Sequence, residues 1–207
     1  MEDRWLHWAK RLQSIASTGQ HFAAEAYDRE RYDEIEDIAA QMMALLGDVP
    51  VERIRNLVSD HAEGYATPKI DVRGALIQDD RILLVREVSD GLWTLPGGYA
   101  DVGISAGENV IKEFWEEASV RVDATVLYRL RHKAKHDYDP DTRDFYKMFF
   151  LCEARGEVAP RPGPETSDAA FFQLSELPPL STGRVIRRDL EAAFECRSAA
   201  KGLTEFD

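Results

Sequence analysis

Three glutamates near the middle of the chain have the residue type and spacing of a metal site. Glu113, Glu116 and Glu117 stand at positions i, i+3 and i+4, so a helix would place all three on one side. Carboxylates at this spacing repel one another. Mg²⁺ or Mn²⁺ would relieve the repulsion, because hard divalent cations prefer carboxylate oxygens. The competing interpretation is an acidic helix face that is merely solvated.

The residues around these glutamates predict the helix that carries them. Ser105 and Glu108 form an S-x-x-E capping box, which starts a helix at Ala106. The apolar residues of the segment fall on the arc opposite the glutamates, namely Val110, Ile111, Phe114, Trp115 and Ala118. Gly97 and Gly98 precede the helix, and glycine lets backbone approach a ligand closely.

Strand patterns surround this helix. Alternating or continuous apolar runs predict strands at 69–77, 81–86, 93–95, 120–130, 146–153 and 169–174. Asp79-Asp80 reads as a turn, 137–144 as a polar loop, and 183–196 as a closing helix. Strands around one central helix, closed by another, predict an α/β sandwich with a mixed sheet.

Residues 1–65 predict a small helical domain, and 66–207 the sandwich domain. A first helix ends at Thr18-Gly19, a second is capped by Asp28 and stops at Gly47-Asp48, and a third runs over 51–59. Three short helices bury little apolar surface alone. The two N-terminal tryptophans, with Met42 and Met43, could form a homodimer contact or simply cover the main domain.

Composition narrows the class of protein. The formal net charge is −12, from 26 basic and 38 acidic residues, which argues against long nucleic acids as partners. No segment has the length of a membrane span or the apolar run of a signal peptide. The two cysteines, Cys152 and Cys196, form no CxxC motif, so a reducing, cytoplasmic setting is expected.

Residues 98–120 resemble a known signature. The Nudix hydrolases carry Gly, five residues, Glu, seven residues, then Arg-Glu-U-x-Glu-Glu-x-Gly-U, where U is aliphatic. This chain matches that frame at Gly98, Glu113, Phe114, Glu116, Glu117 and Val120. The resemblance implies a Nudix α/β/α sandwich over about 69–194. Residues 1–65 resemble the helical extension of a bacterial branch associated with ADP-ribose or CDP-choline hydrolysis and with dimeric enzymes.

Three positions depart from the Nudix pattern. Ile104 stands where the family has its first Glu, Lys112 replaces Arg, and Ser119 replaces Gly. In the family the first Glu and the Arg tie the loop to the helix. Without that partner, Lys112 is expected to pair with Glu108 or Glu116. Ser119 must tolerate a helix-end geometry that glycine accepts more easily.

The resemblance also implies the roles of site residues. Glu113, Glu116, Glu117 and the Gly97 carbonyl would hold Mg²⁺ or Mn²⁺, and a general base would activate water for attack on a phosphorus atom. We expect the base to be Glu165, with Glu116 as the alternative. The residues expected to contact the substrate are Arg73, Arg86, Lys147 and His136.

The expected activity is metal-dependent hydrolysis of the pyrophosphate bond of a nucleoside diphosphate derivative, with ADP-ribose favoured over CDP-choline. Two alternatives remain. Ile104 favours a nucleotide-binding sensor with weak catalysis. The basic residues at 129–135 would serve an RNA-processing enzyme of the same fold, which the net charge disfavours.

Overall fold

The computed structural model describes residues 3–52, 54, 65–101, 103–199 and 204–207. Its contacts divide the chain into two compact units, Met1–Lys69 with Pro140–Asp144, and Ile70–Asp139 with Phe145–Asp207. A domain boundary after residue 65 stays a prediction. Among the described helices, none is long and apolar enough to cross a membrane.

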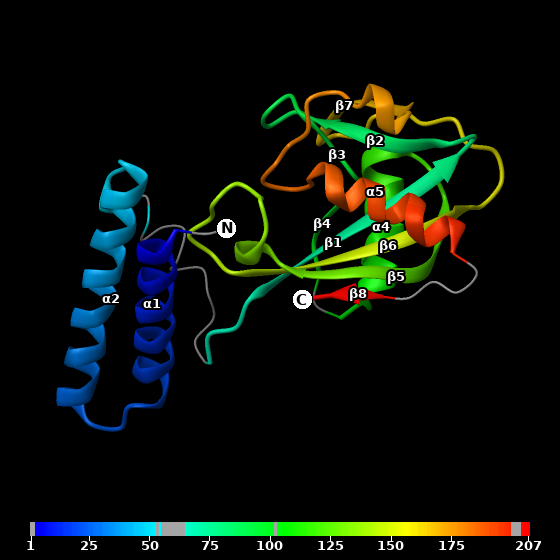
Figure 1. Cartoon of the computed structure of the whole chain (residues 1–207). Helices are drawn as coiled ribbons and strands as arrows, with labels where there is room; N and C mark the ends of the chain where they lie inside the picture. The colour runs from blue at the N-terminus through cyan, green and yellow to red at the C-terminus, as the bar shows by residue number, and fades with distance from the viewer. Residues whose placement is uncertain (1–2, 53, 55–64, 102, 200–203) are drawn as a thin grey trace. The chain divides into compact units, whose positions relative to one another are not determined.

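The first unit is built on a helical hairpin, α1 (Arg4–Phe22) and α2 (Ala26–Gly47) (Figure 1). Asp3 caps α1 by accepting hydrogen bonds from the Trp5 and Leu6 N–H groups, at 2.8 and 3.3 Å. Small buried residues let the helices pack closely. The core of the hairpin consists of Leu6, Ala9, Ala40, Met43, Ala44 and Ile54.

The prediction that α1 ends at Thr18-Gly19 is wrong, because the helix continues to Phe22. Gly19 serves helix packing instead. A Cβ at this position would lie 2.2 Å from Cε1 of Tyr32 on α2, so the ring of Tyr32 occupies the space that a side chain would need.

The second helix begins earlier than predicted. Glu25 is the N-cap residue, and Asp28 lies inside the first turn rather than capping it, where its charge still favours the positive end of the helix dipole. The predicted end at Gly47-Asp48 is confirmed, with Asp48 left-handed at φ 48°. Val51, Glu52 and Ile54 are helical. The remainder of the third helix expected over 51–59 lies outside the described residues.

The second unit contains a mixed sheet. Its strands are β1 (Lys69–Gln78), β2 (Arg81–Glu87), β3 (Trp93–Thr94), β4 (Gly97–Tyr99), β5 (Val122–His132), β6 (Phe145–Ala154), β7 (Thr166–Phe172) and β8 (Glu205–Phe206). The strand order is β3-β2-β1-β6-β5-β8, with β4 paired to β1 and β7 to β2. The pairs β1–β2, β1–β4, β2–β3, β2–β7 and β5–β6 are antiparallel, and β5–β8 is parallel.

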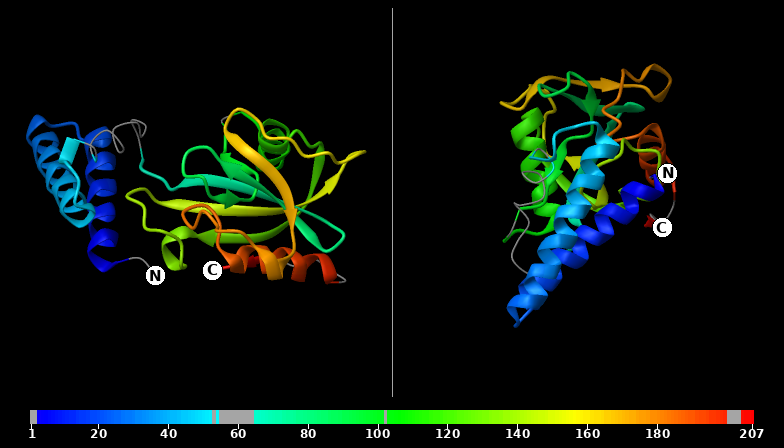
Figure 2. Two further views of the ribbon diagram at one scale, coloured as in Figure 1. Left: turned by 90° about the horizontal axis from the view of Figure 1, so that it is seen from above. Right: turned by 90° about the vertical axis from the view of Figure 1, so that its left-hand side faces the viewer.

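The sheet separates two helices, α4 (Ala106–Ala118) and α5 (Arg187–Ser198) (Figure 2). Successive residues of a strand point to opposite faces. Accordingly Leu83 and Val85 pack in one core with Phe114 of α4, whereas Ile82 and Leu84 pack with Leu190 of α5. The predicted Nudix-type α/β/α sandwich is therefore confirmed.

Three details of the sheet differ from the sequence prediction. No strand was predicted at Gly97–Tyr99, which forms β4 on β1. Strand β8 was not predicted, and β7 begins at Thr166 rather than 169. The turn at Asp79-Asp80 is confirmed, and both residues have positive φ, 47° and 55°, as tight hairpin turns between twisted strands require.

Candidate active site on helix α4

The predicted capping box fixes the start of α4. The Glu108 N–H donates to Oγ of Ser105 at 3.2 Å, and the Ser105 N–H donates to Oε2 of Glu108 at 2.7 Å. Buried Asn109 extends this anchor, because its Oδ1 accepts from the Asp101 N–H at 2.8 Å. The loop before the helix is thereby held against its first turn.

Glu117 is the buried acid of the site, with 5% of its surface exposed. Its Oε2 accepts a hydrogen bond of 2.9 Å from the Gly97 N–H. Burial, together with repulsion from Glu87 and Glu113, raises the pKa of Glu117 to about 8 despite opposition from Arg73 and the Gly97 N–H. This carboxyl holds its negative charge at an energetic cost that a nearby cation would reduce.

The backbone at Gly97 can lie against β1 in this conformation only because the residue is glycine. Its φ is 148°, and a Cβ there would lie 2.0 Å from the Val72 carbonyl oxygen. Glu113 uses the space beside the neighbouring Gly98, where its Oε1 lies 3.1 Å from the position that a Cβ would take. Burial, with repulsion from Glu116 and Glu165, raises the pKa of Glu113 as well.

Glu116 is exposed and is held by Lys112, whose Nζ lies 3.1 Å from Glu116 Oε2. The same Nζ lies 3.0 Å from Oδ2 of Asp101 in the preceding loop. Of the two partners expected for Lys112, Glu116 is therefore confirmed. The expected pair with Glu108 is wrong, because the Glu108 carboxylate accepts the Ser105 N–H in the capping box. Asp101 was missed.

The Asp101–Lys112 pair joins the loop to the helix although Ile104 stands where the Nudix signature has its first Glu. In the Nudix signature a Glu and an Arg join loop and helix, whereas here an Asp three residues before Ile104 and a Lys make such a link. The left-handed geometry expected at Ser119 is also present, with φ 55°.

The carboxylates suit a divalent cation by their chemistry. Glu113 and Glu117 are crowded acids whose pKa values are raised, and hard cations stabilise such oxygens. Their present orientations differ, since Glu117 faces Gly97 and Glu116 faces Lys112. Within the described residues, no three His, Cys, Asp or Glu side chains already converge into a metal-holding group. The Gly97 carbonyl as a ligand stays a prediction.

The segment before β7 brings Glu165 to this helix. Two hydrogen bonds cap the end of α4: the Arg161 N–H donates to the Ala118 carbonyl at 2.9 Å, and Oγ1 of Thr166, the first residue of β7, donates to the Glu117 carbonyl at 2.7 Å. Gly163 is required, because a Cβ there would lie 1.6 Å from the Glu116 carbonyl oxygen. Glu165 is exposed and contributes to the raised pKa of Glu113.

Arg73 and Lys147, two of the expected substrate contacts, are buried, and both form ion pairs with the carboxylate of Asp71. Asp71 lies 3.0 Å from Arg73 Nη2 and 2.7 Å from Lys147 Nζ. Burial alone would raise the pKa of Asp71, but these two cations overcome it and lower that pKa. Burial lowers the pKa of Lys147 to about 8. Arg73 also acts electrostatically on Glu117. Their contact with phosphate stays a prediction.

Arg86 and His136 have different surroundings. Arg86 is exposed and its Nε donates to the Gly91 carbonyl at 2.8 Å. His136 lies with Nε2 2.6 Å from Oδ1 of Asp207. Neither Arg86 nor His136 pairs with Asp71, the partner of Arg73 and Lys147. The roles of Arg86 and His136 in substrate binding also stay predictions. Sequence reasoning missed Asp71, although its i, i+2 spacing from Arg73 places both on one face of a strand.

Comparison with known proteins identifies the family of the chain. Residues 68–194 match the NUDIX domain, and 3–58 match a UDP-X-like, N-terminal oligomerisation domain. The chain belongs to the Nudix family. YjhB of Bacillus subtilis (strain 168), named as a candidate ADP-ribose pyrophosphatase, is a Nudix relative that is 39% identical over 100% of this chain and 99% of its own length.

Two solved structures agree with the fold. An ADP-ribose pyrophosphatase from Streptococcus suis 89-1591 is 40% identical, with a TM-score of 0.62 over 68% of this chain and 100% of its own. A UDP-X diphosphatase is 27% identical, with a TM-score of 0.63 over 98% of each chain. The protein is therefore a Nudix pyrophosphohydrolase.

Proposed function

We propose that this Nudix enzyme uses Mg²⁺ or Mn²⁺ to hydrolyse the pyrophosphate bond of a nucleoside diphosphate derivative, with ADP-ribose favoured over CDP-choline. The observation that carries the proposal is the buried Glu117 carboxylate on the Gly97 N–H, beside Glu113. The preference for ADP-ribose draws support from relatives that carry that substrate in their names, in Bacillus subtilis, Streptococcus suis and Methanocaldococcus jannaschii.

The proposed roles follow from the surroundings of each acid. Glu113, Glu116 and Glu117, with the Gly97 carbonyl, hold the metal, which when bound neutralises the diphosphate and polarises water. Glu165 is the proposed general base, because it is exposed to water yet fixed beside the acids by the capping segment. Glu116 is the alternative base. Arg73, Arg86, Lys147 and His136 are the proposed substrate contacts.

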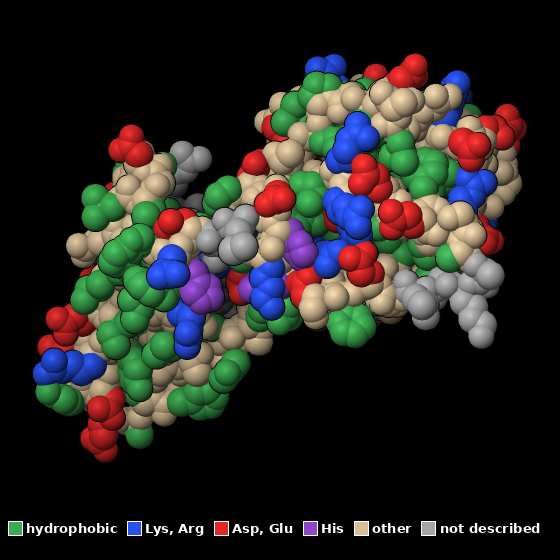
Figure 3. All heavy atoms as spheres, viewed as in Figure 1, with side chains coloured by type: hydrophobic (Ala, Val, Ile, Leu, Met, Phe, Trp, Pro, Cys, Tyr) green, Lys and Arg blue, Asp and Glu red, His purple; other side chains and the backbone are tan. Residues whose placement is uncertain are grey.

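The helical hairpin is the proposed site of homodimerisation. Its family model is described as an oligomerisation domain. Trp5 and Trp8 are 58% and 42% exposed, and hydrophobic atoms run along the hairpin in Figure 3. Met42 is half-buried and remains available, but Met43 is 1% exposed and belongs to the hairpin core. The expectation that Met43 contacts a partner is therefore wrong.

A substrate panel tests the activity. Wild type, Glu117→Gln and the exposed-site control Glu157→Gln would be incubated with Mg²⁺ or Mn²⁺ and ADP-ribose, CDP-choline, UDP-sugars or an NAD-capped RNA. The RNA arm is included because NAD-capped RNA hydrolases are among the relatives. Chromatography would identify the products. We expect AMP and ribose 5-phosphate from ADP-ribose, a loss of at least about 100-fold in Glu117→Gln, and normal rates in Glu157→Gln.

Two outcomes would contradict parts of this proposal. Equal rates in wild type and Glu117→Gln would exclude the α4 carboxylates as the catalytic centre. Binding of metal and nucleotide without turnover of any compound would favour the sensor alternative. The Asp101–Lys112 link argues against that outcome, because it joins loop and helix without a Glu at Ile104.

A further inference from the structure

A cavity of about 370 Å³ lies within the first unit, lined only by residues of that unit. Its lining contains four Lys or Arg residues and a single acid, Asp144. The whole chain has the opposite balance, with a net charge of −12. A cationic concavity in an acidic protein attracts small anions locally, because the low-dielectric walls focus its field. Its volume is in the range of small-molecule sites.

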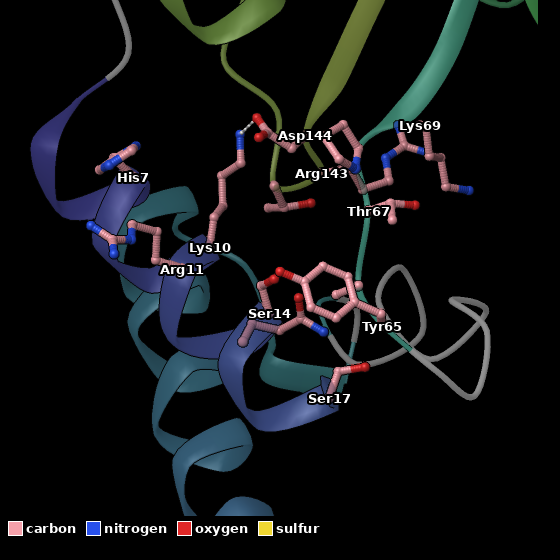
Figure 4. A pocket seen from close by; sticks show the side chains of 14 residues that line it. His7, Lys10, Arg11, Ser14, Ser17, Tyr65, Thr67, Lys69, Arg143 and Asp144 are labelled. Carbon is pink, nitrogen blue, oxygen red and sulfur yellow. Dashed lines mark hydrogen bonds and ion pairs between the residues drawn. The ribbon is translucent and has the colours of Figure 1, made fainter. Parts of the chain in front are cut away.

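One wall of the cavity is a polar face of α1. His7, Lys10, Arg11, Ser14 and Ser17 line it, and their spacing of three or four residues puts them on one side of a helix. The hairpin core uses other positions of the same helix, including Leu6 and Ala9. This polar face therefore lines the cavity, and Figure 4 shows Lys10 extending from it to Asp144.

The opposite wall is held to α1 by specific contacts. Lys10, whose side chain is only 10% exposed, lies with Nζ 2.9 Å from Oδ1 of Asp144. The Ala66 N–H donates to Thr18 Oγ1 at 3.1 Å, and the Lys69 N–H donates to the Asp144 carbonyl at 2.9 Å. Two contacts thus join α1 to the opposite wall, and the third joins two segments of that wall to each other.

The chemistry of the lining identifies a class of ligand. Arg143 pairs with Asp141, which does not line the cavity. Counting Asp141 together with Asp144, two acidic side chains stand against the four Lys and Arg side chains of the lining. Arg and Lys recognise phosphate by charge and hydrogen bonds. The serine and threonine hydroxyls can donate to phosphate or sugar oxygens. Tyr65, 73% exposed, offers a ring at the edge.

We infer that the helical unit carries a second binding site, separate in residues from the α4 carboxylates, for a small phosphate-bearing molecule. The site contains cations and hydroxyls, whereas the catalytic centre is built from carboxylates. Binding here therefore needs no divalent metal. This property separates the inference from the proposed catalytic function and makes it testable when hydrolysis is stopped.

Calorimetry on the full chain in excess EDTA tests the inference, with inorganic phosphate and AMP as probes. The variants are Arg11→Gln in the lining, Ser14→Glu, which adds a negative charge to the cavity, and Arg4→Gln as the control. Arg4 is an exposed cation of α1 outside the lining. We expect at least ten-fold weaker binding in Arg11→Gln, none detectable in Ser14→Glu, and wild-type affinity in Arg4→Gln, with circular dichroism confirming folding of each.

The outcomes separate the alternatives. Equal affinity for phosphate and AMP identifies a simple phosphate site. Tighter AMP binding that falls to the phosphate level in Tyr65→Ala identifies a nucleotide site. No binding to wild type, or equal binding by wild type, Arg11→Gln and Ser14→Glu, would overturn the inference. Hydrolysis by these variants, measured separately with Mg²⁺, shows whether the catalytic centre is intact.

Discussion

At the scale of residues, Glu117 is buried and close to other acids, and both conditions favour its neutral form. The position of the Gly97 N–H and the charge of Arg73 only partly compensate. The residue types and spacing were sufficient to predict three acids on one helix. Their environment was not predictable, because the burial of Glu117 depends on β4, a strand contributed by residues 97–99.

The raised pKa of Glu117 predicts how pH affects the stability of the metal-free protein. Below pH 4.5 the group is protonated in both the folded and unfolded states. Between 4.5 and about 8 the folded state binds the proton more tightly, so the free energy of unfolding falls as pH rises. At about 1.4 kcal/mol per pKa unit, this contribution is several kcal/mol. Denaturant titrations in EDTA at several pH values would measure it.

Glu117→Gln should reduce this dependence, since glutamine does not ionise. Saturating Mg²⁺ should restore the stability of wild type at pH 8, because a cation that binds the folded state alone raises its free energy of unfolding. Parallel pH profiles for wild type and Glu117→Gln in EDTA would show that Glu117 titrates normally.

At the scale of elements, α4 ends on a serine in a left-handed conformation. Ser119 is exposed, with φ 55° and ψ 28°. Glycine adopts this geometry without the Cβ clash, although it also adds entropy to the unfolded chain. We expect Ser119→Gly to raise the free energy of unfolding by about 0.5–1 kcal/mol, measured by denaturant titration. Ser119→Ala keeps the Cβ and should give no gain; equal stabilisation by both variants would exclude the backbone explanation.

Elements were predictable where their signals are local. The start of α4 follows from two side chains one turn apart, and the turn at Asp79-Asp80 from two adjacent residues. Strands β4 and β8 contain a single aromatic residue each, Tyr99 and Phe206, so neither carries the apolar run that predicted the short strand at 93–95. Gly19 led to the wrong prediction that α1 ends there, because glycine is common at helix ends. Here its missing side chain accommodates Tyr32, which a local pattern does not reveal.

At the scale of the whole molecule, the exposed tryptophans of α1 predict assembly. We expect light scattering to give the mass of a dimer for wild type and of a monomer for the double variant Trp5→Lys with Trp8→Lys. Two lysines at these positions would place charge in an apolar contact. Val88→Lys is the matched control, because Val88 is 63% exposed in the second unit, and it should remain dimeric. A monomeric wild type would contradict the prediction.

Strand β8 has a consequence for synthesis of the protein. It covers the outer edge of β5, and Glu205 Oε2 lies 2.5 Å from Nη2 of buried Arg129. These two residues are 76 positions apart. A ribosome adding about 5–20 residues per second needs roughly 4–15 seconds to cover that distance. During this interval the nascent β5 edge has no β8 partner, and an open strand edge is where chains on neighbouring ribosomes can pair wrongly.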